Sequence, residues 1–168
     1  MENKRDGFEK KKITYIMDEN KIRLLTSIGV TNSVLYETDW KYLSRDSLLT
    51  EEFIREFRNE VDWYCISKYQ ELSCEFIREF KEDVNWKNIS DSQKLTDEMI
   101  REFQNIIDWM KISQYQKLSE SIIKEFQNKV DWELISSYQK TTDEFLIEFK
   151  HRIVWDWYFD FQNATFAI

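Results

Sequence analysis

Two residue types that could do chemistry recur in this sequence at a constant interval of 23 residues. They form a serine column and a glutamate column: Ser44, Ser67, Ser90, Ser113 and Ser136, and Glu56, Glu79, Glu102, Glu125 and Glu148. A serine could act as a nucleophile if a histidine activated it, and a row of carboxylates could hold a metal ion or transfer protons. Whether either column takes part in catalysis or metal binding depends on the residues around it.

The residues around the serines argue against catalysis. His151, the only histidine, stands between Lys150 and Arg152 without a recognisable motif, and we interpret it as a surface residue. Cys65 and Cys74 form no CxxC motif, and with one histidine they argue against a zinc site of the usual ligation. No glycine-rich loop could cradle a nucleotide. The sequence therefore predicts no catalytic, metal-binding or cofactor-binding residue, and a protein that is not an enzyme.

The glutamate column has cations beside it. Four of the glutamates directly follow a basic residue, namely Arg55, Arg78, Arg101 and Lys124. A face of mixed charge is typical of a solvated helix, where single ion pairs contribute little to stability. We therefore interpret these glutamates as surface residues and not as a ladder for metal or acid–base work.

Six tryptophans mark the same interval, at Trp40, Trp63, Trp86, Trp109, Trp132 and Trp155. A fixed period of this length is typical of repeat proteins, in which each unit buries its apolar face against its neighbours. The sequence predicts five helical repeats over residues 40–154. A flexible leader (1–12) and an N-terminal capping segment (13–39) precede them, and a C-terminal cap (155–168) follows.

Each unit, numbered from its tryptophan as position 1, carries the signals of two short helices. Serine or threonine at position 11 is a favourable N-cap, and acidic residues follow it where the helix dipole favours them. Apolar positions 14, 15, 18 and 22 share one helical face, so we expect this helix to end near position 22. Aspartate or asparagine at position 23 caps the next helix in the first four units, and Val154 takes that position in the fifth. The predicted fold class is an all-α solenoid of helix–turn–helix repeats.

The tryptophan-containing helix has polar residues on its apolar stripe. Serine at position 5 and, mostly, glutamine at position 8 lie with the tryptophan and with isoleucine or leucine at position 4. Buried polar groups need hydrogen-bond partners, and a helix end leaves carbonyl groups free. We therefore expect the glutamines to tie one unit to the next. We expect each tryptophan to be a wedge between consecutive units.

The end segments leave alternatives open. Residues 13–17 and 21–25 flank a polar centre, which fits a small β-hairpin or an irregular helix, and Gly29 marks a break. Residues 31–39 imitate a later unit with about one helical turn missing. The aromatic residues of 155–168 fit either a cap on the stack or a contact for self-association.

Position 7 is the strongest candidate for partner binding. It is tyrosine in three units, at Tyr69, Tyr115 and Tyr138, and it lies at the boundary of the apolar stripe. These rings either cover the core or present aromatic anchors to a partner. Positions 2, 3, 6, 9, 12, 19 and 20 vary between units, and most of them should face solvent.

Composition narrows the partners and the compartment. The net charge of −8, from 32 acidic and 24 basic residues, argues against binding to nucleic acid. No apolar stretch is long enough to cross a membrane, and the two cysteines suggest no disulfide framework. We expect a cytoplasmic protein whose partner is another protein.

The repeat Asp-Trp-x-x-Ile-Ser-x-x-Gln-x-Leu-Ser-x-Glu-Phe-Ile-x-Glu-Phe is seen best at residues 62–80. It resembles the short tandem repeats in proteins of giant DNA viruses of the mimivirus type, over about residues 40–154. The scarcity of Pro, Gly and Ala, whose codons are GC-rich, agrees with such an AT-rich source. The resemblance transfers no activity; it implies protein interaction, in the host cytoplasm or the virion.

Three functions are compatible with these patterns. The first is a non-enzymatic scaffold that mediates protein–protein interaction through one face of the solenoid. The second is a structural or self-assembling component of a virion or of the viral factory in the host, as a homo-oligomer formed through the C-terminal end. The third is an acidic inhibitor of a basic, nucleic-acid-handling protein, whose complex would depend strongly on salt.

Overall fold

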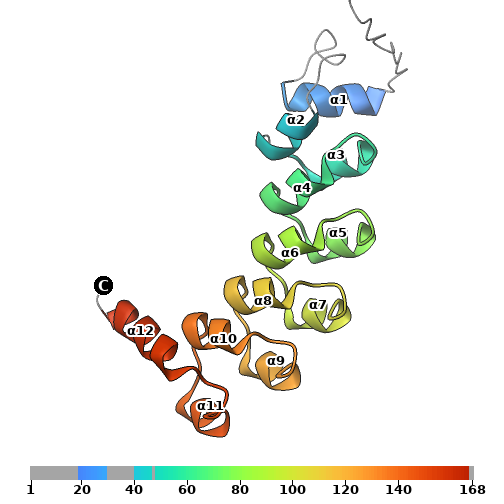
Figure 1. The fold of residues 1–168 in the computed structure, drawn as a ribbon. Coiled ribbons are helices and arrows are strands. Elements are labelled where there is room, and N and C mark those ends of the chain that lie inside the picture. Colours follow the sequence, from blue (N-terminus) through green and yellow to red (C-terminus); the bar gives the residue numbers. More distant parts are fainter. Residues whose placement is uncertain (1–18, 30–39, 47, 167–168) are drawn as a thin grey trace, which may run out of the picture.

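The protein is a curved rod of short helices in the computed structural model, which describes residues 19–29, 40–46 and 48–166 (Figure 1). The described residues form twelve helices and no strand, so the predicted all-α solenoid is confirmed. The helices are α1 (Glu19–Ser27), α2 (Trp40–Asp46), α3 (Glu51–Glu56), α4 (Trp63–Tyr69), α5 (Cys74–Glu79), α6 (Trp86–Ser92), α7 (Asp97–Glu102), α8 (Trp109–Tyr115), α9 (Glu120–Glu125), α10 (Trp132–Tyr138), α11 (Asp143–Glu148) and α12 (Trp155–Phe166).

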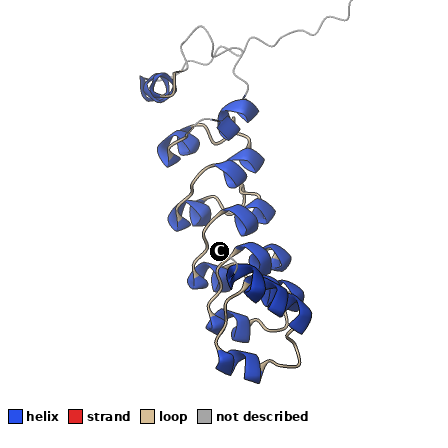
Figure 2. Cartoon of the chain, turned by 90° about the vertical axis from the view of Figure 1, so that its left-hand side faces the viewer, coloured by secondary structure: helices blue, strands red, loops and turns tan. Residues whose placement is uncertain are grey.

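The repeats arrange their helices in two rows. The even-numbered helices from α2 to α12 each begin at one of the six repeated tryptophans, and each packs directly against the next even-numbered helix. Figure 1 shows this row along the inner edge of the arc and α3, α5, α7, α9 and α11 along the outer edge. In the view of Figure 2 the same helices are joined by short loops. Close packing of the inner row with wider spacing of the outer row produces the curvature.

The odd-numbered helices begin at the predicted N-caps. Thr50 Oγ1 accepts from the backbone N–H of Phe53 at 3.1 Å, and the position-11 residues of the other four units make the same bond. The helices are six residues long, which is too short for stability in isolation. Packing between units must therefore hold them in place.

These helices end earlier than the sequence pattern predicts. Helix α3 ends at Glu56, position 17, and the expectation of a helix to position 22 is wrong. The N–H groups of Glu60 and Val61 both donate to the carbonyl oxygen of Phe57 at 3.0 Å, which closes a separate turn. This turn keeps Val61 buried on the same side as Phe57, so the apolar spacing imitates a continued helix.

The even-numbered helices follow the expected boundaries. Asp62 Oδ1 accepts from the N–H of Cys65 at 2.9 Å, and Asn85, Asp108 and Asp131 cap α6, α8 and α10 in the same way. Helix α4 ends at Tyr69, and Gln70 has an extended backbone conformation at the C-cap. The glutamine side chain therefore leaves the helix at the point where the even-numbered row meets the loops.

The core lies between the two rows. Positions 4, 14, 15, 18 and 22 of the units supply most of its buried apolar side chains, such as Ile66, Phe76, Ile77, Phe80 and Val84. Burial of each such side chain stabilises the fold by roughly 1.5–3 kcal/mol. The core is continuous along the rod because each unit also contributes to the faces of its neighbours.

The first described segment is helical. Residues 21–25 belong to α1, so the β-hairpin expectation is wrong for its second arm. The adjacent residues Leu24 and Leu25 are both buried, which fits one face of a helix, whereas a strand with a single buried face would place them on opposite sides. Gly29 follows the helix with φ 80, a left-handed conformation that glycine adopts freely, and the predicted break is confirmed. The leader 1–12, the arm 13–17 and the degenerate unit at 31–39 lie outside the described residues.

Helix α12 takes the next place in the even-numbered row and packs against α10. It is twelve residues long, whereas the other helices of the row have seven. Trp157 and Phe159 are 54% and 56% exposed, and Tyr158 packs against the core. The helix therefore covers the end of α10 and still presents aromatic side chains to solvent.

Candidate protein-binding surface

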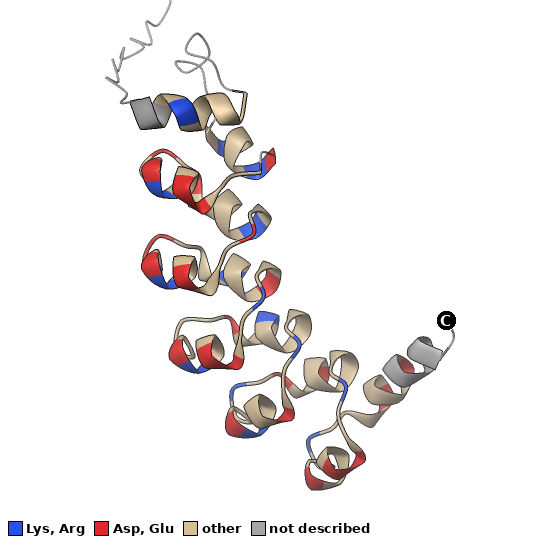
Figure 3. Ribbon diagram, turned by 180° about the vertical axis from the view of Figure 1, so that it is seen from behind, with Lys and Arg blue, Asp and Glu red and all other residues tan. Residues whose placement is uncertain are grey.

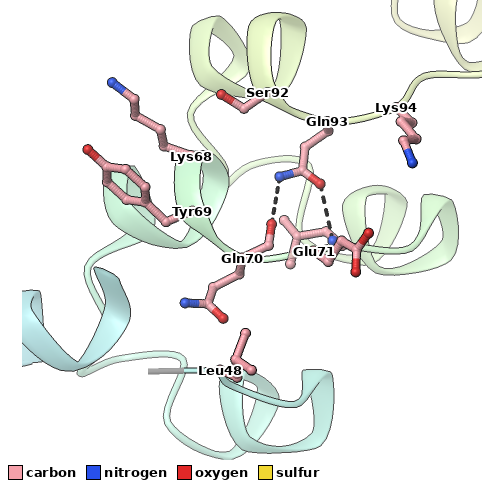
Figure 4. A pocket seen from close by; sticks show the side chains of 9 residues that line it. Leu48, Lys68, Tyr69, Gln70, Glu71, Ser92, Gln93 and Lys94 are labelled. Carbon is pink, nitrogen blue, oxygen red and sulfur yellow. Dashed lines mark hydrogen bonds between the residues drawn. The ribbon is translucent and has the colours of Figure 1, made fainter. Parts of the chain in front are cut away.

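The position-8 glutamines join the units as predicted. Gln93 Nε2 donates to the carbonyl oxygen of Gln70 at 2.7 Å, and Gln93 Oε1 accepts from the N–H of Leu72 at 3.1 Å (Figure 4). Gln93 Nε2 also donates to the carbonyl oxygen of Ser67 at 3.0 Å. Gln116 and Gln139 make the same three bonds to the unit before them. We call Gln70, Gln93, Gln116 and Gln139 the glutamine ladder. Each amide is buried, and its bonds fix the position of one unit relative to the next.

The position-5 serines are structural. Ser67 Oγ donates to the carbonyl oxygen of Trp63 at 2.6 Å and accepts from the N–H of Asn85 at 2.8 Å. Ser90, Ser113 and Ser136 have the equivalent two bonds, and Ser44 accepts from Asp62. All five are buried, and His151 is exposed. The serine column therefore connects each even-numbered helix to the residue that precedes the next even-numbered helix.

The tryptophans bridge consecutive units. Trp63 Nε1 donates to the carbonyl oxygen of Arg58, in the turn of the preceding unit, at 3.0 Å. Its ring contacts Phe80 and Phe76 of its own unit, with centroids 5.1 and 6.3 Å apart. Trp155 keeps the equivalent bond to Lys150, but its ring–ring contacts among the described residues are with Tyr158 and Phe159 of its own helix. The wedge role thus applies to the four tryptophans that have both the bond to the preceding turn and such a phenylalanine ahead of them, from Trp63 to Trp132.

The position-16 cations also connect units. Arg55 Nε donates to Glu79 Oε2 of the next unit at 2.8 Å, and the pairs Arg78–Glu102, Arg101–Glu125 and Lys124–Glu148 repeat this contact. The hydrogen bond to glutamate raises the pKa of each of these cations above its ordinary value. The mixed-charge surface was expected, but the sequence did not indicate that its pairs run between units. These pairs are exposed, so each contributes little.

The position-7 tyrosines lie at the C-terminal ends of α4, α8 and α10. Tyr69, Tyr115 and Tyr138 are 48%, 53% and 48% exposed. Lys68 Nζ lies 5.5 Å from the centroid of the Tyr69 ring, and Lys111 Nζ lies 5.0 Å from that of Tyr115. Each ring therefore has one part against the protein and one part in solvent, which is compatible with both alternatives predicted for this position.

A pocket of about 380 Å³ lies beside Tyr69 (Figure 4). Lys68, Glu71, Lys94 and Leu48 line it together with the ladder residues Gln70 and Gln93. The position-9 residues thus border the position-7 row. Lys94, Lys117 and Lys140 share that position in successive units, a pattern that is visible in the sequence once the tyrosines are taken as the centre of the surface.

Most of the variable positions were expected to face solvent, but two residues at position 3 do not. Cys65 and Asn88 are buried between neighbouring even-numbered helices, and Asn88 Nδ2 donates to the carbonyl oxygen of Tyr64 at 3.0 Å. Burial raises the pKa of the Cys65 thiol, helped by the Asp62 carboxylate. Cys65 therefore has little thiolate at neutral pH.

Charge is segregated between the two rows (Figure 3). The odd-numbered helices α3 to α11 contain thirteen acidic and four basic residues. The even-numbered helices α2 to α10, with the position-9 residue that follows each, contain eight basic and four acidic residues. Helices α2 to α10 with their position-9 residues are therefore positive in a chain of net charge −8. We call the exposed residues of these helices, with the position-9 residues, the inner surface.

Three observations on the described residues bear on other kinds of site. They contain no group of three or more His, Cys, Asp or Glu residues placed to hold a metal ion. None of their helices is long and apolar enough to cross a membrane. Cys65 and Cys74 are free thiols.

Comparison with known proteins adds no further assignment. The chain matches no family model, and no curated protein or solved structure is detectably similar to it.

Proposed function

We propose that this protein is a non-enzymatic scaffold that binds another protein through the inner surface. The observation that carries the proposal is the glutamine ladder, in which Gln93 makes three buried hydrogen bonds to the unit before it. Such a connection repeats through the array and holds the backbone in a fixed register. The side chains outside the ladder are then displayed in rows whose identities differ from unit to unit.

The composition of the inner surface supports protein recognition. Tyrosine supplies a large contact area with little loss of side-chain entropy, and it is enriched at positions that dominate binding energy. Tyr69, Tyr115 and Tyr138 are half-exposed and stand next to lysines. The buried serines and glutamines are fully engaged in structural bonds, which leaves the exposed rows as the residues available to a partner.

Selection from a random peptide library tests the proposal. The immobilised protein should enrich peptides that lose binding when Tyr69, Tyr115 and Tyr138 are all replaced by alanine. The matched control replaces Glu75, Glu98 and Glu144, three exposed residues of the odd-numbered helices, by alanine and should retain the peptides. Equal binding to both triple variants, or no enrichment by the parent protein, would contradict the proposal.

A second candidate function, self-association through α12, rests on a different observation. Trp157 and Phe159 are exposed on that helix, and Ile147 is exposed where other units have arginine or lysine. Apolar side chains grouped on a surface favour association. Light scattering of the parent and of Trp157→Ser/Phe159→Ser decides it, because a monomer in both cases excludes the idea.

The source and the location follow the resemblance of residues 62–80. We propose a giant-virus origin and action in the host cytoplasm or the virion. The genomic neighbourhood of the coding sequence tests both, and a cellular gene context would contradict them.

A further inference from the structure

The basic residues of the two rows of helices differ in how many of them form ion pairs. On the odd-numbered helices, the four position-16 cations each pair with a glutamate of the next unit. On the inner surface, Arg45 pairs with Asp46, and Lys111 lies 3.9 Å from Asp91. Among the described residues, Lys68, Lys87, Lys94, Lys117 and Lys140 have no ion pair. Lys81 and Lys150, in turns after odd-numbered helices, also have no ion pair within the described part of the chain, but the odd-numbered helices α3 to α11 carry thirteen acidic and four basic residues. The excess of positive over negative charge therefore lies on the inner surface.

These lysines do not compensate free helix ends. The C-terminal end of α4 would attract cations through its unpaired carbonyls, but Gln93 Nε2 already donates to the carbonyl oxygens of Ser67 and Gln70 there. The same bonds from Gln116 and Gln139 cover α6 and α8. Lys94 and Lys117, which follow α6 and α8, thus lie beyond carbonyl groups that already have a donor from the ladder. Their charge is available to a partner on the inner surface.

The position-7 and position-9 rows combine ammonium groups with phenol hydroxyls. Tyr115 with Lys117 and Tyr138 with Lys140 repeat the combination on consecutive units, and Lys94 precedes them by one unit. An ammonium group can only donate hydrogen bonds, and a phenol readily donates one. A matching occupant therefore carries acceptors with negative charge, together with apolar parts that can lie against the rings.

We infer that the inner surface binds an extended acidic segment of a partner protein, with one carboxylate on each of Lys94, Lys117 and Lys140. The inference rests on the proposed scaffold function and specifies the chemistry of its partner. Adjacent packed helices are about 8–10 Å apart, and three residues of an extended chain span about 10 Å. The carboxylates of the partner segment accordingly recur at every third residue.

A nucleic acid fits this surface less well. A single strand carries one phosphate for each nucleotide, whereas the row offers one lysine for each unit and the whole chain has a net charge of −8. The field of the odd-numbered row, with its thirteen acidic residues, repels a long polyanion. A short segment with spaced carboxylates meets the lysines with less repulsion, because it carries fewer negative charges.

Fluorescence anisotropy with the full chain tests the inference. The probe is a labelled peptide of repeated Glu-Ser-Ser triplets, about 15 residues long, which spans five units. It should bind in low salt and weaken as the salt rises from about 0.02 to about 0.2 M, since exposed charges are screened. A peptide of Lys-Ser-Ser triplets should not bind. Lys117→Gln/Lys140→Gln should weaken the acidic peptide by about tenfold, because two exposed ion pairs are lost together.

The matched control has the same change in net charge on the other side of the repeat. Lys81→Gln/Lys150→Gln replaces two exposed lysines of the turns after α5 and α11 and should change binding by less than about twofold. Equal weakening by both double variants, absence of binding, or tighter binding of a single-stranded oligonucleotide than of the acidic peptide would overturn the inference. If the library selects neutral or basic peptides that still need the tyrosines, the acidic partner is wrong but the scaffold function stands.

Discussion

Gln93 donates from its side-chain Nε2 to the backbone carbonyl oxygen of Gln70 at 2.7 Å, and this bond joins the position-8 residues of consecutive units. Gln116 donates in the same way to Gln93, and Gln139 to Gln116. The repeat is thereby connected through a buried polar contact as well as through its apolar core. Because a buried amide without partners is costly, this contact also selects one register between units.

Replacement of Gln93 by leucine should destabilise the array. The change leaves the Leu72 N–H and the carbonyl oxygens of Gln70 and Ser67 without the partner they have in the parent. Unsatisfied buried groups cost roughly 1–3 kcal/mol each, so we expect a loss of about 3 kcal/mol after partial hydration. Urea unfolding followed by circular dichroism measures it. Gln114→Leu, on α8 and outside the ladder, should stay within about 0.5 kcal/mol of the parent.

Replacement of a tryptophan by alanine should lower the free energy of unfolding by an amount that depends on the position of that tryptophan in the array. Trp86 contacts the Phe103 ring at 4.6 Å and donates to the Lys81 carbonyl oxygen, so Trp86→Ala should cost about 3–5 kcal/mol and divide the stack. Trp155 is 39% exposed, and the phenylalanine ring that it contacts, Phe159 of the same helix, is 5.9 Å away between centroids, so Trp155→Ala should cost clearly less. Calorimetry of both variants compares them. Equal losses, or a Trp86→Ala protein that melts like the parent, would show that the wedge interpretation is wrong.

The Lys124–Glu148 pair should be visible in a titration. The bond raises the pKa of Lys124 above that of the unfolded chain. The contribution of the pair to stability is therefore fully present below the ordinary lysine pKa of about 10.4. It is lost as the pH rises through the higher folded-state pKa. An NMR titration of Lys124 should show a lower midpoint in Glu148→Gln than in the parent.

Glu144→Gln is the control for that titration, because Glu144 lies on the same helix without contacting Lys124. Its Lys124 midpoint should match the parent. Added salt should lower the midpoint in the parent, since the pair is exposed. A midpoint that is unchanged in Glu148→Gln would mean that the pair does not form in solution.

The two cysteines should differ in reactivity. Cys65 is buried with a raised pKa, whereas Cys74 is half-buried at the start of α5. Because the thiolate is the reacting form, iodoacetamide at neutral pH should modify Cys74 first. Peptide mass spectrometry over time gives both rates, and the difference should vanish in urea. Faster modification of Cys65 in the folded protein would indicate that α4 opens readily.

Most helix boundaries could be predicted from short-range sequence signals. Thr50 and Asp62 start helices because a side-chain oxygen next to an apolar stripe suits an N-cap, and that relation lies within a few residues. The early end of α3 was not predictable from spacing, since Val61 is buried either by a continued helix or by the separate turn at Phe57. The choice between them depends on how the chain must turn to reach the next unit.

The sequence predicted that polar residues contact a neighbouring unit, but it did not predict which residues they contact. The burial of Gln93 implied partners in a neighbouring unit, but their identity depends on the spacing of the even-numbered row. Arg55 illustrates the same difficulty: Glu51 and Glu56 are close in sequence, yet its shortest ion pair is with Glu79 of the next unit. The helix over residues 21–25 was ambiguous because its flanking segments carry no repeat to compare with.

Each amide of the ladder reaches back by one unit, and this makes the length of the rod a modular property. Deletion of residues 86–108 would place Gln116 where Gln93 now stands, opposite the carbonyl oxygens of Gln70 and Ser67. The new junction would reuse chemistry that the chain already contains. Gain or loss of whole units in the gene can therefore change how many residues a partner meets without the need for a new fold.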